Sequence, residues 1–192
     1  MSTYTAFLGH SRLASGSLAA VARQGKAHAD TDPGATILVY DDETGRPMDI
    51  DYRGTIDDVL ARLAPADDVE PVAPVSDARR GPGRPRLGVV AREVTLLPRH
   101  WEWLGAQPGG ASVALRRLVE DASRQNAAVD RRRQASEAVD RLMLALGGDL
   151  PGYEEASRAF HRGERERFEA LLEAWPADVR DYVRMLAQPV FA

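Results

Sequence analysis

RGPGRPRLGVVAREVTLLPRHWEWL, residues 80–104, is the stretch that decides how this chain is organised. It holds five arginines and three prolines, and its second half is an apolar run followed by a proline and two tryptophans. The run from Val89 to Leu97 predicts a β-strand, because apolar and β-branched residues dominate it. Pro98 is placed to open a helix, since proline is well tolerated at the first helical position. The sequence therefore predicts a basic arm, a strand and a helix in the middle of the chain.

The positive charge of the chain is concentrated around this stretch, although the 192 residues carry a net charge of −4. Residues 1–78 hold 6 basic and 13 acidic groups, residues 79–133 hold 12 and 5, and residues 134–192 hold 7 and 11. A basic segment attracts polyanions whatever fold carries it, so this asymmetry is informative about partners. It favours a nucleic-acid partner for the middle of the chain.

Residues 1–63 have the pattern of a small α/β domain. Ser17 and Thr55 are placed as N-caps of two amphipathic helices. Asp41–Gly45 has the composition of a hairpin turn. Three short strands are expected, at residues 4–8, 36–40 and 48–52. The predicted order of elements is β-α-β-β-α.

The rest of the chain divides into three segments. Residues 64–88 are rich in proline and glycine and predict a linker that ends in the basic arm. Residues 89–147 predict the strand, the short helix and, after a glycine break, a second helix that is capped by Ser112 and extends to Gly147. Residues 148–192 predict further helices. The positions expected to face inward in the two central helices are Trp101, Leu104, Val113, Leu115, Leu118, Val119 and Ala122.

Residues 83–123 resemble a ribbon-helix-helix DNA-binding unit, in which a strand precedes two helices. In that family, two subunits pair one strand each into an antiparallel ribbon that fits the major groove. Elementary physics supports the need for a second copy, because a lone strand leaves its backbone groups unpaired. The resemblance implies a homodimer that binds double-stranded DNA. It also implies that Arg92 and Thr95 are candidates for contact with base edges, and that the helix start around Ser112 is a candidate for contact with phosphate.

The arm carries a second resemblance. Gly83-Arg84-Pro85-Arg86 is similar to the core of an AT-hook, which lies in a narrow A·T minor groove. This implies that Arg84, Pro85 and Arg86 contact the groove and the phosphates beside it.

The strand residues favour an alternative function. If Leu97 faces inward, the outward residues are Arg92, Val94 and Leu96, which are mostly apolar. If Val94 and Leu96 face inward instead, Glu93 faces outward, and its negative charge repels phosphate. The alternative is therefore a protein-interaction module that uses the ribbon only to dimerise.

Several motifs along the chain are also similar to a bacterial family known only as a domain of unknown function. They are residues 92–101, 109–114, 148–152 and 175–180, together with Phe168. The implied fold class is α+β, with a small N-terminal β-α-β-β-α unit, a central ribbon-helix-helix-like dimerisation unit and a C-terminal helical segment.

No pattern in the sequence points to catalysis, so we expect a protein that is not an enzyme and has no cofactor. The four histidines are scattered and there is no cysteine, which argues against a metal site. No membrane span or secretory signal is visible. The expectation is a cytoplasmic transcriptional regulator, whose effector the sequence does not identify.

Overall fold

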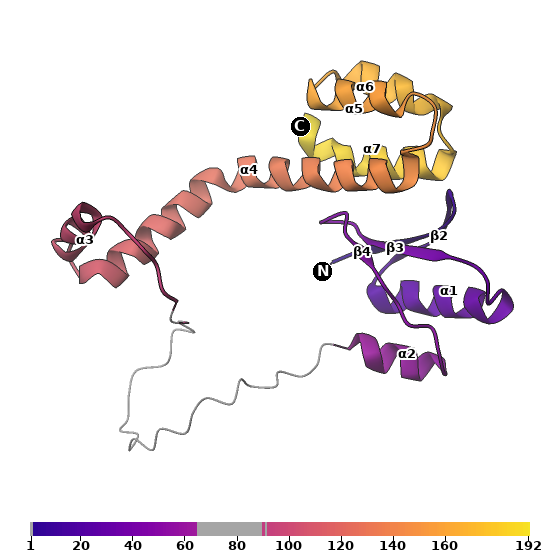
Figure 1. The fold of residues 1–192 in the computed structure, drawn as a ribbon, viewed down its shortest axis with the longest axis horizontal. Coiled ribbons are helices and arrows are strands. Elements are labelled where there is room, and N and C mark those ends of the chain that lie inside the picture. Colours follow the sequence, from indigo (N-terminus) through magenta and orange to yellow (C-terminus); the bar gives the residue numbers. More distant parts are fainter. Residues whose placement is uncertain (1, 65–89, 91) are drawn as a thin grey trace. The chain divides into compact units, whose positions relative to one another are not determined.

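The computed structural model describes residues 2–64, 90 and 92–192. The chain forms two compact units, one joining Met1–Asp67 with Ala128–Ala192 and the other comprising Asp68–Ala127. A small antiparallel sheet and a set of helices make the protein α+β, which confirms the predicted class (Figure 1). No helix in the described part of the chain is long and apolar enough to cross a membrane.

The sheet belongs to the first unit and has the strand order β2-β1-β3-β4. Its strands are β1 (Tyr4–Leu8), β2 (Ser11–Gly16), β3 (Ile37–Asp41) and β4 (Pro47–Met48). All neighbouring strands are antiparallel, and β1 pairs with both β2 and β3.

Two details of the sheet correct the sequence prediction. The polar strand β2 was not expected, because its exposed edge position gives it no hydrophobic alternation. The strand predicted at residues 48–52 is wrong beyond Met48, since the chain leaves the sheet there although Ile50 and Tyr52 stay half-buried. The N-terminal order is therefore β-β-α-β-β-α.

The two N-terminal helices begin where the sequence predicts. In α1 (Leu18–Thr31), the Ser17 hydroxyl accepts a hydrogen bond from the Ala20 amide at 3.3 Å. In α2 (Ile56–Leu63), Thr55 and Asp58 form a reciprocal capping box. Both N-cap predictions are confirmed, because capping depends on residues that are near in sequence.

The remaining helices are α3 (Pro98–Gly105), α4 (Gly110–Gly147), α5 (Tyr153–His161), α6 (Arg165–Leu171), a 3₁₀ turn (Leu172–Ala174) and α7 (Ala177–Phe191). The predicted continuation of the second central helix to Gly147 is confirmed by the 38 residues of α4. The C-terminal helices are confirmed as well.

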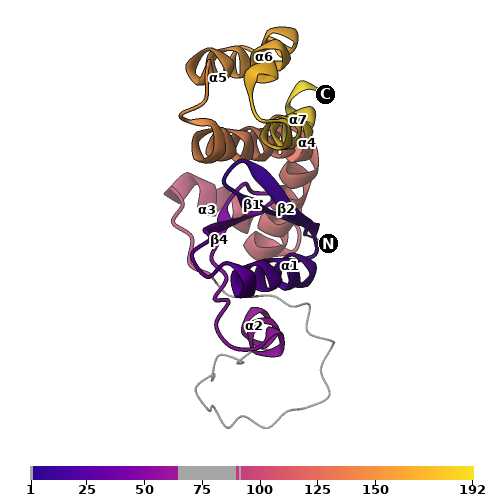
Figure 2. The ribbon, with the colours of Figure 1, turned by 90° about the vertical axis from the view of Figure 1, so that its right-hand side faces the viewer.

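The core of the first unit lies on both faces of the sheet. Ala6 packs with Val21 of α1 on one face, whereas its neighbour Phe7 joins the larger core formed by the C-terminal helices and the last turns of α4. Alternate residues of a strand point to opposite faces, which accounts for this division. In Figure 2 the sheet lies between α1 and the pair α4 and α7. The two ends of the chain therefore share one core.

Candidate nucleic-acid interface

The helices of the second unit follow local sequence signals. Pro98 occupies the first turn of α3, as predicted. The expected glycine break is confirmed, since Gly109 in the turn after α3 and Gly110 at the start of α4 have φ values of +83° and +75°. A Cβ on Gly109 would lie 3.1 Å from the Val113 side chain, so this turn favours glycine for both its backbone and its packing.

The segment ahead of α3 contains two of the predicted contact residues. Arg92 and Thr95 are both exposed and lie in neither a helix nor a strand, whereas Leu96 is half-buried. A ribbon strand obtains its hydrogen bonds from a second copy, and the structure holds a single chain. Pairing of this segment therefore stays a prediction. The other predicted contacts, Arg84, Pro85 and Arg86, lie outside the described residues.

Ser112 does not have the predicted capping role. Because α4 already begins at Gly110, Ser112 lies within the first turn of the helix and is exposed. The helix starts at Gly110, three residues before the Val113 start that a Ser112 cap would give. The amides of the first turn still lack intrahelical partners, so Ser112 remains near free backbone donors.

The apolar residues of the second unit are mostly uncovered in the single chain. Among its described residues only Leu104 and Ala114 are buried, which confirms Leu104 as a core position. Trp101 is 43% exposed, so the prediction that it lies in the core of this chain is wrong. The predicted inward positions Val113, Leu118, Val119 and Ala122 are exposed as well. The exposed large apolar side chains of this unit are Val90, Val94, Leu97, Trp101, Trp103, Val113, Leu118 and Val119.

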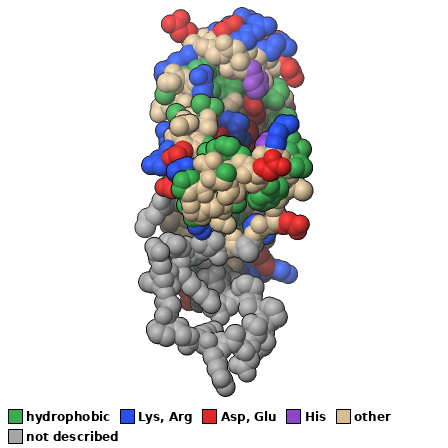
Figure 3. All heavy atoms as spheres, turned by 90° about the vertical axis from the view of Figure 1, so that its left-hand side faces the viewer, with side chains coloured by type: hydrophobic (Ala, Val, Ile, Leu, Met, Phe, Trp, Pro, Cys, Tyr) green, Lys and Arg blue, Asp and Glu red, His purple; other side chains and the backbone are tan. Residues whose placement is uncertain are grey.

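These side chains lie on α3, on the first turns of α4 and on the segment before α3. In the space-filling view of Figure 3, hydrophobic side chains gather among basic and acidic ones on the face toward the viewer. A large exposed apolar patch on a soluble protein commonly marks a site where another molecule binds. We name these eight side chains the apolar face.

The described part of the second unit carries little net charge. Residues 90 and 92–127 contain five arginines and four acidic residues. Arg124 pairs with Asp121 at 2.8 Å. The basic excess of the middle of the chain therefore lies mainly at residues 79–86, outside the described residues, and at 131–133 of α4.

Four arginines of this unit form no ion pair with any described residue: Arg92, Arg99, Arg116 and Arg117. Sequence reasoning missed Arg116 and Arg117, which have the acids Glu120 and Asp121 four residues later. In a helix, an ion pair is weaker when the basic residue precedes the acid than when the acid comes first. This order of charges is the sequence signal that could have identified Arg116 and Arg117.

Potential metal-ligating side chains are scattered over the described residues. No three His, Asp or Glu side chains there gather closely enough to hold a metal ion. His161 and Asp140 form an isolated pair at 3.1 Å on the first unit.

The comparisons with known proteins show a family. The profile of a family described as an uncharacterized protein conserved in bacteria, DUF2239, matches residues 3–187. The chain belongs to the DUF2239 family. No curated protein and no solved structure matches the chain.

Membership of DUF2239 confirms the resemblance to an uncharacterised bacterial family, and the match includes both ends of the chain as well as its middle. The family description states no activity, and the match supports neither the ribbon-helix-helix nor the AT-hook resemblance. The function must be argued from the apolar face and the arginines.

Proposed function

We propose that this DUF2239 protein is a homodimeric, cytoplasmic DNA-binding regulator rather than an enzyme. The two copies would meet at the apolar face, and the basic arm would contact the duplex. The observation that carries the proposal is the exposure of the apolar face, whose residues follow a strongly basic segment in the sequence.

The need for a partner follows from the burial of the second unit. Leu104 and Ala114 alone bury too little apolar surface to hold α3 against α4, because folding must offset the conformational entropy of every ordered residue. Covering the apolar face would supply the missing burial, since each large apolar side chain contributes about 1.5 to 3 kcal/mol when fully removed from water.

A second copy of the chain fits this face better than an unrelated partner. The segment Arg92–Leu97 has no strand partner within the described chain, and the same segment of a second copy offers identical backbone donors and acceptors. Two such segments can pair antiparallel about a two-fold axis, which is the usual symmetry of homodimers. Trp101 and Trp103, both exposed in the single chain, would then lie beside the ribbon as interface residues.

The proposed DNA contacts come from the arginines of the arm and from the segments that follow it. Arg84 and Arg86 in the arm would lie in a minor groove and against phosphates, with Pro85 keeping the arm extended. Arg92 and Thr95 are the candidates for base edges in the major groove, and the first turn of α4 at Ser112 offers backbone amides to a phosphate. A dimer would present each of these groups twice.

One observation favours the alternative of a protein-interaction module that only dimerises. Five arginines and four acidic residues nearly cancel in the described part of the second unit. Val94 is 54% exposed on the segment that would read the bases, and an apolar valine recognises few base edges. The test must therefore separate DNA contact from dimerisation.

The decisive experiment measures DNA binding of the full chain by fluorescence anisotropy. Wild type is compared with Arg84→Ala/Arg86→Ala on an A·T-rich and a G·C-rich duplex at several salt concentrations. We expect the double variant to lose more affinity for the A·T-rich duplex, because a narrow A·T minor groove concentrates negative potential. The slope of log affinity against log salt should fall by roughly 1 for each arginine removed, if each contacts a phosphate.

Arg165→Ala/Arg167→Ala is the matched control, since it removes two arginines that lie on α6 in the other unit. This control should keep the affinity and the salt slope of wild type. Binding of neither duplex by a dimeric wild-type protein at physiological salt would overturn DNA binding and favour the interaction module.

A further inference from the structure

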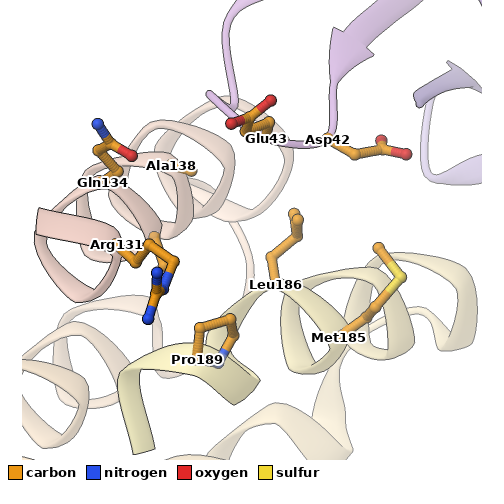
Figure 4. Close-up of a pocket in the computed structure, with 9 residues that line it drawn as sticks. Asp42, Glu43, Arg131, Gln134, Ala138, Met185, Leu186 and Pro189 are labelled. Carbon is orange, nitrogen blue, oxygen red and sulfur yellow. The ribbon is translucent and has the colours of Figure 1, made fainter. Parts of the chain in front are cut away.

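A cavity of about 240 Å³ lies in the first unit. Three elements line it: the hairpin between β3 and β4, the middle of α4 and the last turns of α7. Figure 4 shows Glu43 on the hairpin, Arg131 on α4, and Leu186 and Pro189 on α7 around the same space. The cavity is thus formed by segments from both ends of the chain.

The hairpin side of the cavity is held in place by several contacts. The Asp41 carboxylate accepts hydrogen bonds from the amides of Glu43 and Thr44, both at 2.9 Å. Arg141 of α4 donates to the Thr44 carbonyl, and Tyr182 of α7 donates to the Asp42 carboxylate. These bonds position the hairpin tip, so the site is ordered before any ligand arrives.

Two opposite charges line this cavity without a partner. Glu43 and Arg131 form no ion pair with each other or with any other described residue, although they come from facing elements of one cavity. Arg133, two residues along α4, pairs with both Asp130 and Glu137. Glu43 and Arg131 therefore offer one unpaired charge of each sign around the same cavity.

The third side of the cavity is apolar. Leu186 and Pro189 line it together with Met185, which is 45% exposed. Leu186 projects into the space between the hairpin and α4 in Figure 4. Methionine is a flexible and polarisable side chain that adapts to the shape of apolar ligands. This side would accept a small aliphatic or aromatic group.

We propose that the cavity binds a free α-amino acid with an apolar side chain. Glu43 would accept the ammonium group, Arg131 would bind the carboxylate, and Met185, Leu186 and Pro189 would contact the side chain. A cavity of about 240 Å³ suits a molecule of that size, since a cavity of roughly 150 Å³ can already hold benzene. The inference does not depend on the proposed DNA binding, because every residue it uses lies in the first unit.

The first part of the test compares four probes by isothermal titration calorimetry with the full chain. The probes are L-leucine, leucinamide, N-acetyl-leucine and glycine. Leucine should bind most tightly, because leucinamide lacks the carboxylate, N-acetyl-leucine lacks the ammonium group and glycine lacks the apolar group. Loss of one exposed charge pair should weaken binding by up to about fivefold.

The second part assigns each charge to its residue. Arg131→Gln should weaken leucine binding and leave leucinamide binding unchanged, whereas Glu43→Gln should weaken leucine binding and leave N-acetyl-leucine binding unchanged. Met185→Ala should reduce the difference between leucine and glycine.

The controls are Arg132→Gln, Glu166→Gln and Leu144→Ala, which change exposed residues that do not line this cavity. They should bind leucine as wild type does. Equal affinity for all four probes, no binding of leucine at millimolar concentration, or an equal effect of control and cavity variants would each overturn the proposal.

Discussion

The hydroxyl of Tyr182 on α7 donates a 2.7 Å hydrogen bond to the carboxylate of Asp42, a residue 140 positions earlier in the sequence. Tyr182 is 1% exposed, and its ring also packs against Phe7 of β1. The bond therefore connects the tip of the N-terminal hairpin to the C-terminal helix through the shared core.

Removing this hydrogen bond should destabilise the protein. We expect Tyr182→Phe to lower the free energy of unfolding by about 1 to 2 kcal/mol, because a buried bond to a charged acceptor is lost. Chemical denaturation followed by circular dichroism measures the change. Tyr153→Phe is the control, since the half-buried Tyr153 hydroxyl bonds to no described residue. Equal stability of the two variants would contradict the role of the Asp42 bond.

The same tyrosine predicts a loss of stability at alkaline pH. Burial and the hydrogen bond to Asp42 raise the pKa of Tyr182 well above its ordinary value. A raised folded-state pKa contributes stability that is fully present below the unfolded pKa, about 10, and is lost as the pH rises toward the folded value. Between about pH 9 and 11, the stability of wild type should therefore fall more steeply than that of Tyr182→Phe. The free energy of unfolding of both proteins is measured by denaturation at each pH. If it falls equally in wild type and in Tyr182→Phe, this linkage is excluded.

Gly45 should tolerate no side chain. Its φ is +64°, and an added Cβ would lie 2.5 Å from the Ala138 carbonyl oxygen and 2.8 Å from the Ala138 Cα. Because both atoms belong to the backbone of α4, the hairpin would have to move. We expect Gly45→Ala to cost roughly 2 to 4 kcal/mol of unfolding free energy, the sum of backbone strain and overpacking.

Gly9→Ala provides the matched control for Gly45. Gly9 also has a positive φ, +55°, but an added Cβ would meet nothing within 4 Å. Its cost should be only the backbone strain of about 1 kcal/mol. A thermal or chemical denaturation series in which both variants lose the same stability would show that the contact with Ala138 does not matter.

The proposed dimer predicts a difference between two equally exposed side chains. Val119 of the apolar face and Leu144 in the other unit are each 65% exposed in the single chain. Val119→Glu should convert a dimer into a monomer at micromolar concentration, because it places a charge in the proposed interface. Leu144→Glu should leave the dimer intact. The mass in solution, from light scattering after size exclusion, distinguishes the two.

Proline at Val94 tests the ribbon part of the same interface. Val94→Pro removes one backbone donor from the segment that would pair with its copy, so it should weaken the dimer. A wild-type protein that is monomeric at micromolar concentration would contradict the dimer, and a fully dimeric Val94→Pro variant would contradict the ribbon.

The sequence by itself determined the features that depend on near neighbours. Ser17 and Thr55 mark the starts of α1 and α2, because an N-cap bonds to amides only three residues away. Pro98 marks α3, and the two glycines after Gln107 separate it from α4. The α+β class and the C-terminal helices follow from periodicity over short windows in the same way.

Only the tertiary structure decided what depends on packing. The residues of β2 show no hydrophobic alternation, so the sequence does not predict this strand. The strand forms at the edge of the sheet because its backbone pairs with β1. Helical periodicity predicts that Leu118 and Val119 face inward, but both are exposed. Their burial depends on tertiary packing, which periodicity does not specify. The contact between the rings of Phe7 and Tyr182, with centroids 5.2 Å apart, joins the two ends of the chain in one core. Local propensity carries no information about such a contact, because its energy exists only once both segments have folded against each other.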